Sequence, residues 1–130
     1  MTDYTPYIHE ITETLIDIEQ WFAGTDDQGV LTRLMARFSP QFSMIAPNGQ
    51  TLDHSALNAL FERLGGARPG LRITLSEWHG IEQHPGGATV SYRELQAETG
   101  GAQTDRRATA VIEKRPSGAL VWRHLHETFC

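Results

Sequence analysis

Apolar residues recur at intervals of three and four in the first part of the chain, which is the spacing of one helix face. Between residues 5 and 24 this stripe consists of Ile8, Ile11, Leu15, Ile18 and Phe22. Thr5 stands where an N-cap is expected, Pro6 suits the first turn, and Gly24 suits the C-terminal end. The pattern predicts a helix from Thr5 to Gly24.

Two shorter helices are predicted further along the chain. The first covers 29–38 and is closed by Ser39-Pro40, because the residue before a proline avoids helical angles. The second covers 52–66 and has Asp53 as its N-cap. Between the two helices, a short strand is predicted before a turn at Asn48-Gly49.

From residue 71 onward, apolar and polar positions alternate, which is the period of a strand. Four such stretches follow one another, at 71–84, 88–98, 105–115 and 119–129. The segments PGG, TGGAQ and RPSG separate them and are typical of hairpins. We therefore expect a single α+β domain, 1–130, with three N-terminal helices packed on a curved, mainly antiparallel sheet.

Composition and charge narrow the functional classes. The chain has 130 residues and a formal net charge of −5, which argues against nucleic acid because phosphate binding needs a basic patch. No apolar stretch approaches the ~20 residues that span a bilayer. The first ten residues carry no secretory signal, and Cys130 is the single cysteine. We expect a cytoplasmic protein that binds neither nucleic acid nor membranes.

Four segments carry a family resemblance that extends from Ile8 to Thr128: FSPQFSMIAPNGQTLDHSALNALF, ATVSYRELQ, RRATAVIEKRPSG and WRHLHETF. The chain resembles the nuclear-transport-factor-2-like superfamily, and within it the small SnoaL-like proteins. The resemblance implies a cone-shaped α+β barrel, also called cystatin-like, in which a long first helix lies across a bent sheet. It does not imply one activity, because this fold hosts isomerases, cyclases, dehydratases, ligand-binding domains and oligomerisation modules.

The resemblance provides a test for ketosteroid isomerase chemistry, which needs a carboxylate base to move a proton next to a carbonyl. In such enzymes the base lies at the end of the first strand, directly before a proline. Here that place is occupied by Ala46, before Pro47, and alanine cannot accept a proton. The next carboxylate, Asp53, is explained as a helix cap. We therefore do not expect this isomerase chemistry.

Two histidines near the C-terminus, His124 and His126, point to the same side of a strand. A metal site would need a third ligand, and the sequence offers none at a matching spacing, so neither a metal nor another cofactor is predicted. Trp122 shares this face by alternation. We predict that Trp122, His124 and His126 form a packed sheet face or the interface of a homodimer. Proton transfer or ligand binding by the two histidines is the alternative.

The opposite side of this strand carries Arg123, Leu125 and Glu127, and a second resemblance implies that they line a pocket. The segment also resembles the end of the association domain of the calcium/calmodulin-dependent kinase. There the residue after the second histidine is an arginine that points into the pocket. The matching residue here is Glu127, so the resemblance implies that a carboxylate ligand would be repelled.

On the preceding strand, Arg106, Ala108 and Ala110 share one face by alternation. The two alanines would leave room for a ligand, and Arg106 is predicted to form a buried ion pair with Glu127, because a buried carboxylate is costly without a partner. Two solvated charges at the rim are the alternative. Trp78 is predicted to close the pocket mouth or to lie in the core.

The strand at 88–98 has one face made of Val90, Tyr92, Glu94 and Gln96. This face is either a polar pocket wall or part of the outer surface, and we favour the outer surface for Glu94 and Gln96.

Three functions stay open. The first is a barrel that binds a small hydrophobic molecule. The second is a SnoaL-like acid–base enzyme (a cyclase, dehydratase or isomerase) acting on a hydrophobic carbonyl compound, with Glu127 as the best catalytic candidate. The third is an association module.

Overall fold

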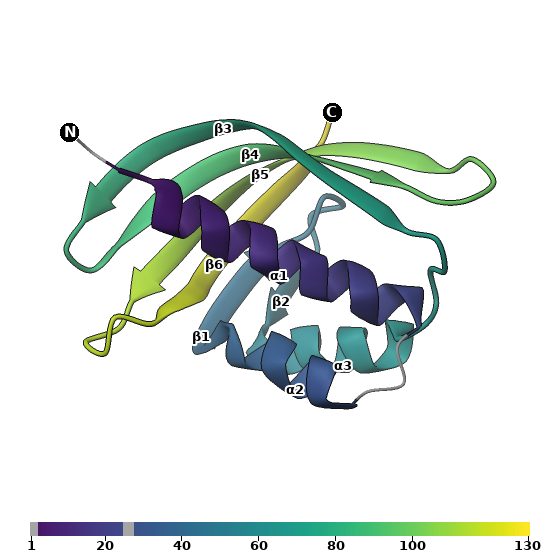
Figure 1. Cartoon of the computed structure of the whole chain (residues 1–130), viewed down its shortest axis with the longest axis horizontal. Helices are drawn as coiled ribbons and strands as arrows, with labels where there is room; N and C mark the ends of the chain where they lie inside the picture. The colour runs from purple at the N-terminus through teal and green to yellow at the C-terminus, as the bar shows by residue number, and fades with distance from the viewer. Residues whose placement is uncertain (1–2, 25–27) are drawn as a thin grey trace.

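A computed structural model describes residues 3–24 and 28–130. These residues form three helices and six strands (Figure 1): α1 (Thr5–Ala23), α2 (Gln28–Ala36), β1 (Phe38–Ile45), β2 (Thr51–Asp53), α3 (His54–Leu64), β3 (Arg72–His84), β4 (Gly87–Ala97), β5 (Gln103–Lys114) and β6 (Leu120–Phe129). The expected α+β class, the three N-terminal helices and the long C-terminal strands are confirmed.

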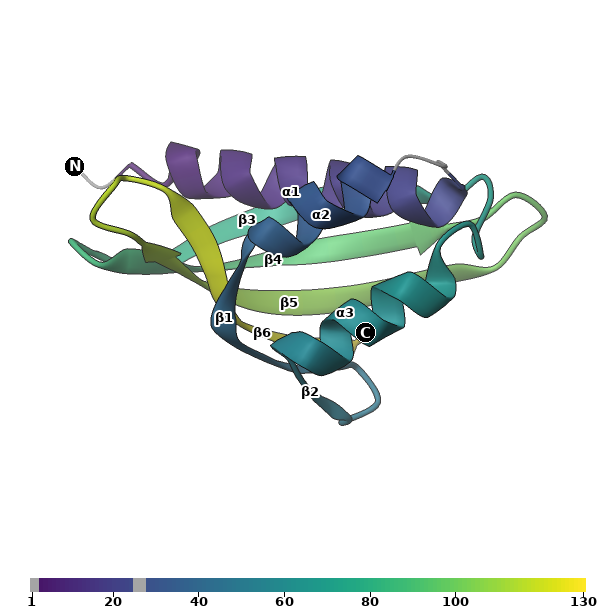
Figure 2. The same cartoon turned by 90° about the horizontal axis from the view of Figure 1, so that it is seen from below.

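The strands lie in the order β2-β1-β6-β5-β4-β3. The strand β1 runs parallel to β6, and every other neighbouring pair is antiparallel. The sheet does not close on itself, since β2 and β3 are its edges. Figure 1 shows α1 crossing in front of the strands, and Figure 2 shows α3 near β1 and β2.

Local signals set two of the helix ends. The αL conformation of Gly24, with φ of 109°, ends α1, and the Asp53 side chain accepts a hydrogen bond from the backbone N–H of Ala56 at 2.8 Å. The prediction of Thr5 as N-cap is wrong, because the helix starts at Thr5 itself. The second helix ends two residues earlier than predicted, at Ala36, because Phe38 already belongs to β1.

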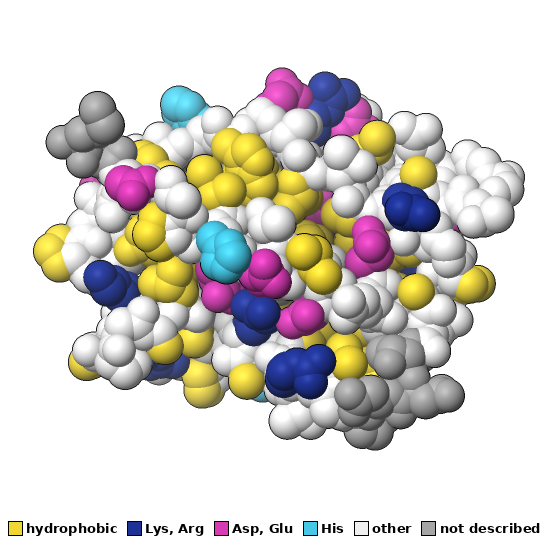
Figure 3. All heavy atoms as spheres, viewed as in Figure 1, with side chains coloured by type: hydrophobic (Ala, Val, Ile, Leu, Met, Phe, Trp, Pro, Cys, Tyr) yellow, Lys and Arg dark blue, Asp and Glu magenta, His cyan; other side chains and the backbone are white. Residues whose placement is uncertain are grey.

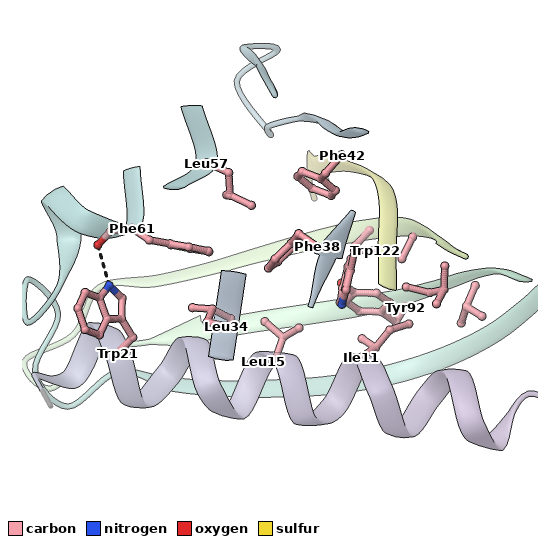
Figure 4. Close-up of a cluster of buried hydrophobic side chains, with 14 of the residues drawn as sticks. Ile11, Leu15, Trp21, Leu34, Phe38, Phe42, Leu57, Phe61, Tyr92 and Trp122 are labelled. Atoms are coloured by element: carbon pink, nitrogen blue, oxygen red, sulfur yellow. Dashed lines mark hydrogen bonds between the residues drawn. The ribbon is translucent and has the colours of Figure 1, made fainter. Parts of the chain in front are cut away.

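The apolar stripe of α1 packs into a core with aromatic residues of β1, α3 and β6 (Figure 4). Phe38 lies against Trp122, with ring centroids 5.7 Å apart, and both are almost fully buried. The Trp21 indole donates a hydrogen bond to the carbonyl of Phe61 at 2.7 Å, which ties α1 to α3. No helix among the described residues is long and apolar enough to span a membrane.

Candidate functional site

The register of the central strands gathers polar side chains on the face that α1 covers, which we call the inner face. Tyr92 of β4 lies opposite Ala108 of β5, and Ala108 lies opposite Glu127 of β6. In the next row Glu94 lies opposite Arg106. Because neighbouring strands are ~4.8 Å apart, these rows bring a tyrosine, two carboxyl groups and a guanidinium close together.

A cavity of about 190 Å³ is bordered by these rows and by α1, β1 and α3. Most of its wall is apolar, and the aromatic part consists of Phe22, Phe38, Phe42, Phe61, Tyr92 and Trp122. The charged part lies at one end and consists of Arg68, Glu94, Arg106 and Glu127. A mainly apolar wall with a few convergent polar groups is typical of small-molecule sites.

The buried pair of Arg106 and Glu127 is present in the structure. One guanidinium nitrogen of Arg106 lies 3.4 Å from a carboxylate oxygen of Glu127, and their side chains are only 15% and 7% exposed. The guanidinium also donates to the hydroxyl of Thr104 at 3.3 Å and lies 5.3 Å from the ring centre of Phe129. The two charges therefore face the inside rather than solvent at the rim.

A second chain of hydrogen bonds runs from the cavity to the surface. The side-chain amide of Gln96 donates to Glu94, and Arg68 donates to the Gln96 carbonyl at 2.6 Å and to Glu98 at 2.8 Å. Glu94 and Gln96 are both buried. The preference for placing them on the outer surface is therefore wrong. Gln96 donates a hydrogen bond to Glu94 inside the protein, and Arg106 lies opposite Glu94 in the register.

Burial controls the protonation of this end of the cavity. It raises the pKa of Glu127 to about 7, with the negative charge of Glu94 acting in the same direction and Arg106 opposing it. Burial also raises the pKa of Glu94, against the hydrogen bond from Gln96 and the charges of Arg106 and Arg68. The pKa of Tyr92 lies well above its usual range for the same reason, so its hydroxyl stays protonated.

Two buried polar atoms of this group lack partners among the described residues. They are the hydroxyl oxygen of Tyr92 and the Nε of Arg106. Buried polar groups are nearly always hydrogen-bonded in native proteins, so each exception calls for an explanation. Both atoms belong to residues that line the cavity.

Comparison with solved structures decides the family. The protein is 43% identical to an NTF2-like protein of unknown function from Pseudomonas aeruginosa, with a TM-score of 0.91 over 95% of this chain and 98% of that one. The chain belongs to the NTF2-like superfamily. No family model matches the sequence, and no curated protein matches it.

More distant likenesses show the NTF2-like fold alone. An NTF2-like protein from Cytophaga hutchinsonii is 14% identical, with a TM-score of 0.78 over the whole of both chains. The association domain of CaMKII from C. elegans is 16% identical, with a TM-score of 0.71 over 95% of this chain and 94% of that domain.

The last strand of this NTF2-like protein contains a bulge that alternation could not reveal. Ile112 lies opposite Trp122, whereas the adjacent Val111 lies opposite His124, so Arg123 is an extra residue in β6. The placement of Trp122 on a dimer face is therefore wrong: its indole points inward and donates to Thr14 of α1 at 3.0 Å. Arg123 does not line the cavity and donates to the carbonyl of Gln41 instead.

The two histidines lie on the opposite, outer face of the sheet. His124 shares a hydrogen bond of 2.7 Å between its Nδ1 and the hydroxyl of Ser43, and His126 is exposed. Trp122 does not share this face with the two histidines, whose neighbours in the register are Thr109 and Val111. This face is therefore more polar than predicted. Within the described ranges, no three His, Cys, Asp or Glu side chains are grouped to hold a metal ion.

Leu125 lines the cavity, as the resemblance implied. The prediction that Ala108 and Ala110 line it is wrong, because both are buried in the sheet and neither is among the lining residues. Trp78 is partly buried against the core, with its ring centre 5.1 Å from that of Tyr92. It does not line this cavity but lines a separate hollow of about 330 Å³ between α1 and β3, where Figure 3 shows apolar side chains at the surface. It reaches this hollow because β3 is bulged and Glu77 adopts a φ of 54°.

Sequence reasoning named Glu94 and Gln96 but favoured the wrong side of the sheet for them, and it did not name Arg68. The available signal was that Glu94 shares its strand face with Val90 and Tyr92, two residues typical of a core. A carboxylate is placed on such a face only where other elements supply partners. For Gln96 the partner is Arg68, 28 residues away in the chain.

Proposed function

We propose that this NTF2-like protein binds a compact, mainly apolar small molecule in the inner cavity. The observation that carries the proposal is the buried Tyr92 hydroxyl, which has no partner among the described residues although Tyr92 lines the aromatic-walled cavity. A ligand with one polar end would complete its hydrogen bonding. The narrower assignment, a SnoaL-like protein with a cone-shaped pocket, is part of this proposal.

Size and wall chemistry limit the ligand. An apolar cavity of ~150 Å³ holds benzene, so the cavity here suits one six-membered ring with a short polar arm. The test is ligand-observed NMR with toluene, benzyl alcohol, benzylamine and benzoate. At least one compound is expected to bind with a millimolar or lower Kd, and Leu125→Trp, which fills the cavity, should abolish that binding.

The matched control for this experiment is His126→Ala, because His126 lies on the outer face of the same strand. It should leave ligand binding unchanged. If none of the four compounds binds, or if Leu125→Trp binds them as the unmodified protein does, the proposal is refuted.

An acid–base enzyme is the second candidate, and the pKa of Glu127, raised by burial to about 7, favours it. A carboxyl group with this pKa can both accept and return a proton at neutral pH. The Tyr92 hydroxyl could then hold the oxygen of a carbonyl substrate. The test is exchange of the methyl protons of acetophenone in D₂O, which should depend on Glu127 and stop in Glu127→Gln.

Association is the third candidate, supported by likeness to a solved structure described as a CaMKII association domain. We propose that a homodimer would use the outer face around His124 and His126. His126→Ala should then weaken association more than ligand binding, and Glu127→Gln should do the reverse. Sedimentation of both variants measures association, and ligand-observed NMR measures ligand binding. If each variant changed association and binding equally, the assignment of the two faces would be contradicted.

A further inference from the structure

The charged groups around the cavity can be counted element by element among the described residues. The lining residues of α1, β1 and α3 carry no charge. Glu94 comes from β4, Arg106 from β5 and Glu127 from β6, while Arg68 lies before β3 and is paired with Glu98. Arg68 also opposes the rise in the pKa of Glu94, but its own charge is balanced by Glu98. Two guanidinium groups therefore stand against three carboxyl groups, and the set is neutral only when it holds one proton.

We propose that the cavity binds a compact organic amine in its protonated form, whose ammonium group replaces the proton held by Glu94 and Glu127. This inference rests on the proposed small-molecule function and names the chemical class of its ligand. With the amine bound, two carboxylates face one guanidinium and one ammonium. The buried group is thus neutral both before and after binding, which avoids an uncompensated buried charge.

The hydrogen-bonding capacity of the site fits an ammonium group. Each carboxylate offers about four lone-pair directions. The protein supplies Glu94 with the amide of Gln96, and Glu127 with one guanidinium nitrogen at 3.4 Å. An ammonium has three donors, and the two carboxylates, which come from adjacent register rows, supply its acceptors. A carboxylate that has lost its proton also gains capacity to accept from the Nε of Arg106.

The aromatic wall supports the same class of ligand. Phe38, Phe42 and Trp122 line the cavity together with Tyr92. Aromatic faces attract cations, and more so in sites shielded from water. An anionic ligand would add a second negative charge beside Glu94 and Glu127, so benzoate should be the poorest ligand of its size.

The experiment is calorimetric titration of the full chain with benzylamine, benzyl alcohol and benzoate, which share one ring and differ in charge. Benzylamine should bind at least tenfold more tightly than benzyl alcohol at pH 8, and benzoate should not bind. Between pH 6 and pH 8 the affinity for benzylamine should rise about tenfold, because its binding expels a proton from a group that titrates near pH 7.

Titrations in two buffers of different ionisation enthalpy measure the proton release directly. Glu127→Gln should remove both the preference for the amine and its pH dependence while keeping benzyl alcohol binding. Glu94→Gln serves as a second variant if Glu127→Gln does not fold. Glu77→Gln, an exposed carboxylate on the outer face, is the control and should change nothing.

The outcomes separate this inference from the proposed function. If benzyl alcohol binds as tightly as benzylamine, or if no proton is released, the amine assignment is overturned and the small-molecule site stands. If none of the three compounds binds, the proposed function fails, and the amine assignment fails with it.

Discussion

The two faces of the sheet carry similar carboxylate–arginine pairs. The pKa values of their carboxyl groups are shifted in opposite directions on the two faces. On the inner face, burial raises the pKa of Glu127 to about 7 although Arg106 lies beside it. On the outer face, the hydrogen bond from Arg93 lowers the pKa of Asp105, and hydrogen bonds from Arg93 and Arg107 lower that of Glu77. The partner is an arginine in each case.

Solvent explains this difference. The outer side chains of Glu77 and Asp105 are 45% and 25% exposed, against 7% for Glu127, so the hydrogen bonds from arginine outweigh the smaller cost of burial there. Glu127 loses its hydration in the cavity, shares Arg106 with Glu94, and holds it only at 3.4 Å. Burial therefore outweighs pairing on the inner face. Glu127 keeps its proton up to about neutral pH, whereas the outer carboxyl groups lose theirs in acid.

The largest expected effect comes from removing the inner guanidinium. Arg106→Met leaves Glu94 and Glu127 buried without a counter-charge, and we expect a loss of about 3 kcal/mol in unfolding free energy at pH 8. Denaturant titration measures it. Arg93→Met on the outer face is the matched variant and should cost much less, because its partners stay hydrated. Equal losses from both variants would contradict the comparison.

A smaller effect is expected from pH. The folded pKa of Glu127 lies above its value of 4.5 in the unfolded chain, so folded protein binds more protons between these values and its stability falls as pH rises from about 4.5 to 7. Glu127→Gln should remove about 2 kcal/mol of this loss. The lowered pKa values of Asp105 and Glu77 act oppositely: their contribution is lost as pH falls through those values.

Urea titrations from pH 4.5 to pH 8 on the two proteins test this sign. The difference in stability between Glu127→Gln and the unmodified protein should grow in favour of the variant toward pH 8. A difference that is constant with pH would show that Glu127 titrates alike in the folded and unfolded chain.

The smallest effects concern packing on the two faces of β6. Trp122→Phe removes a buried indole that bonds Thr14, so we expect a loss of about 1.5 kcal/mol. His126→Ala removes an exposed side chain and should change stability by less than about 0.5 kcal/mol. Thermal unfolding of both variants compares the two losses in stability. A larger loss for His126→Ala would mean that the faces of β6 are reversed.

Patterns that act within one element could be predicted from the sequence. The stripe of α1, the cap at Asp53 and the four alternating strands each depend on neighbours in the chain. The pairing of Arg106 with Glu127 was also within reach, because regular alternation holds at both residues.

Features that depend on a shift of register could not be predicted. The extra residue Arg123 in β6 turns Trp122 inward, and the bulge at Glu77 turns Trp78 toward α1. Neither bulge contains the glycine or proline that would mark it. The burial of Glu94 likewise depends on Arg106 and Gln96, whose positions are known only once the strands are paired.

The most direct test of the inner face is an NMR titration of the Glu127 side-chain carboxyl carbon, assigned by comparison with Glu127→Gln. The structure predicts a midpoint close to pH 7 for Glu127. The carboxyl carbons of Glu77 and Asp105, recorded in the same spectra, should titrate below their usual ranges. A midpoint for Glu127 at or below 4.5 would show that pairing outweighs burial, and it would contradict a proton-holding cavity.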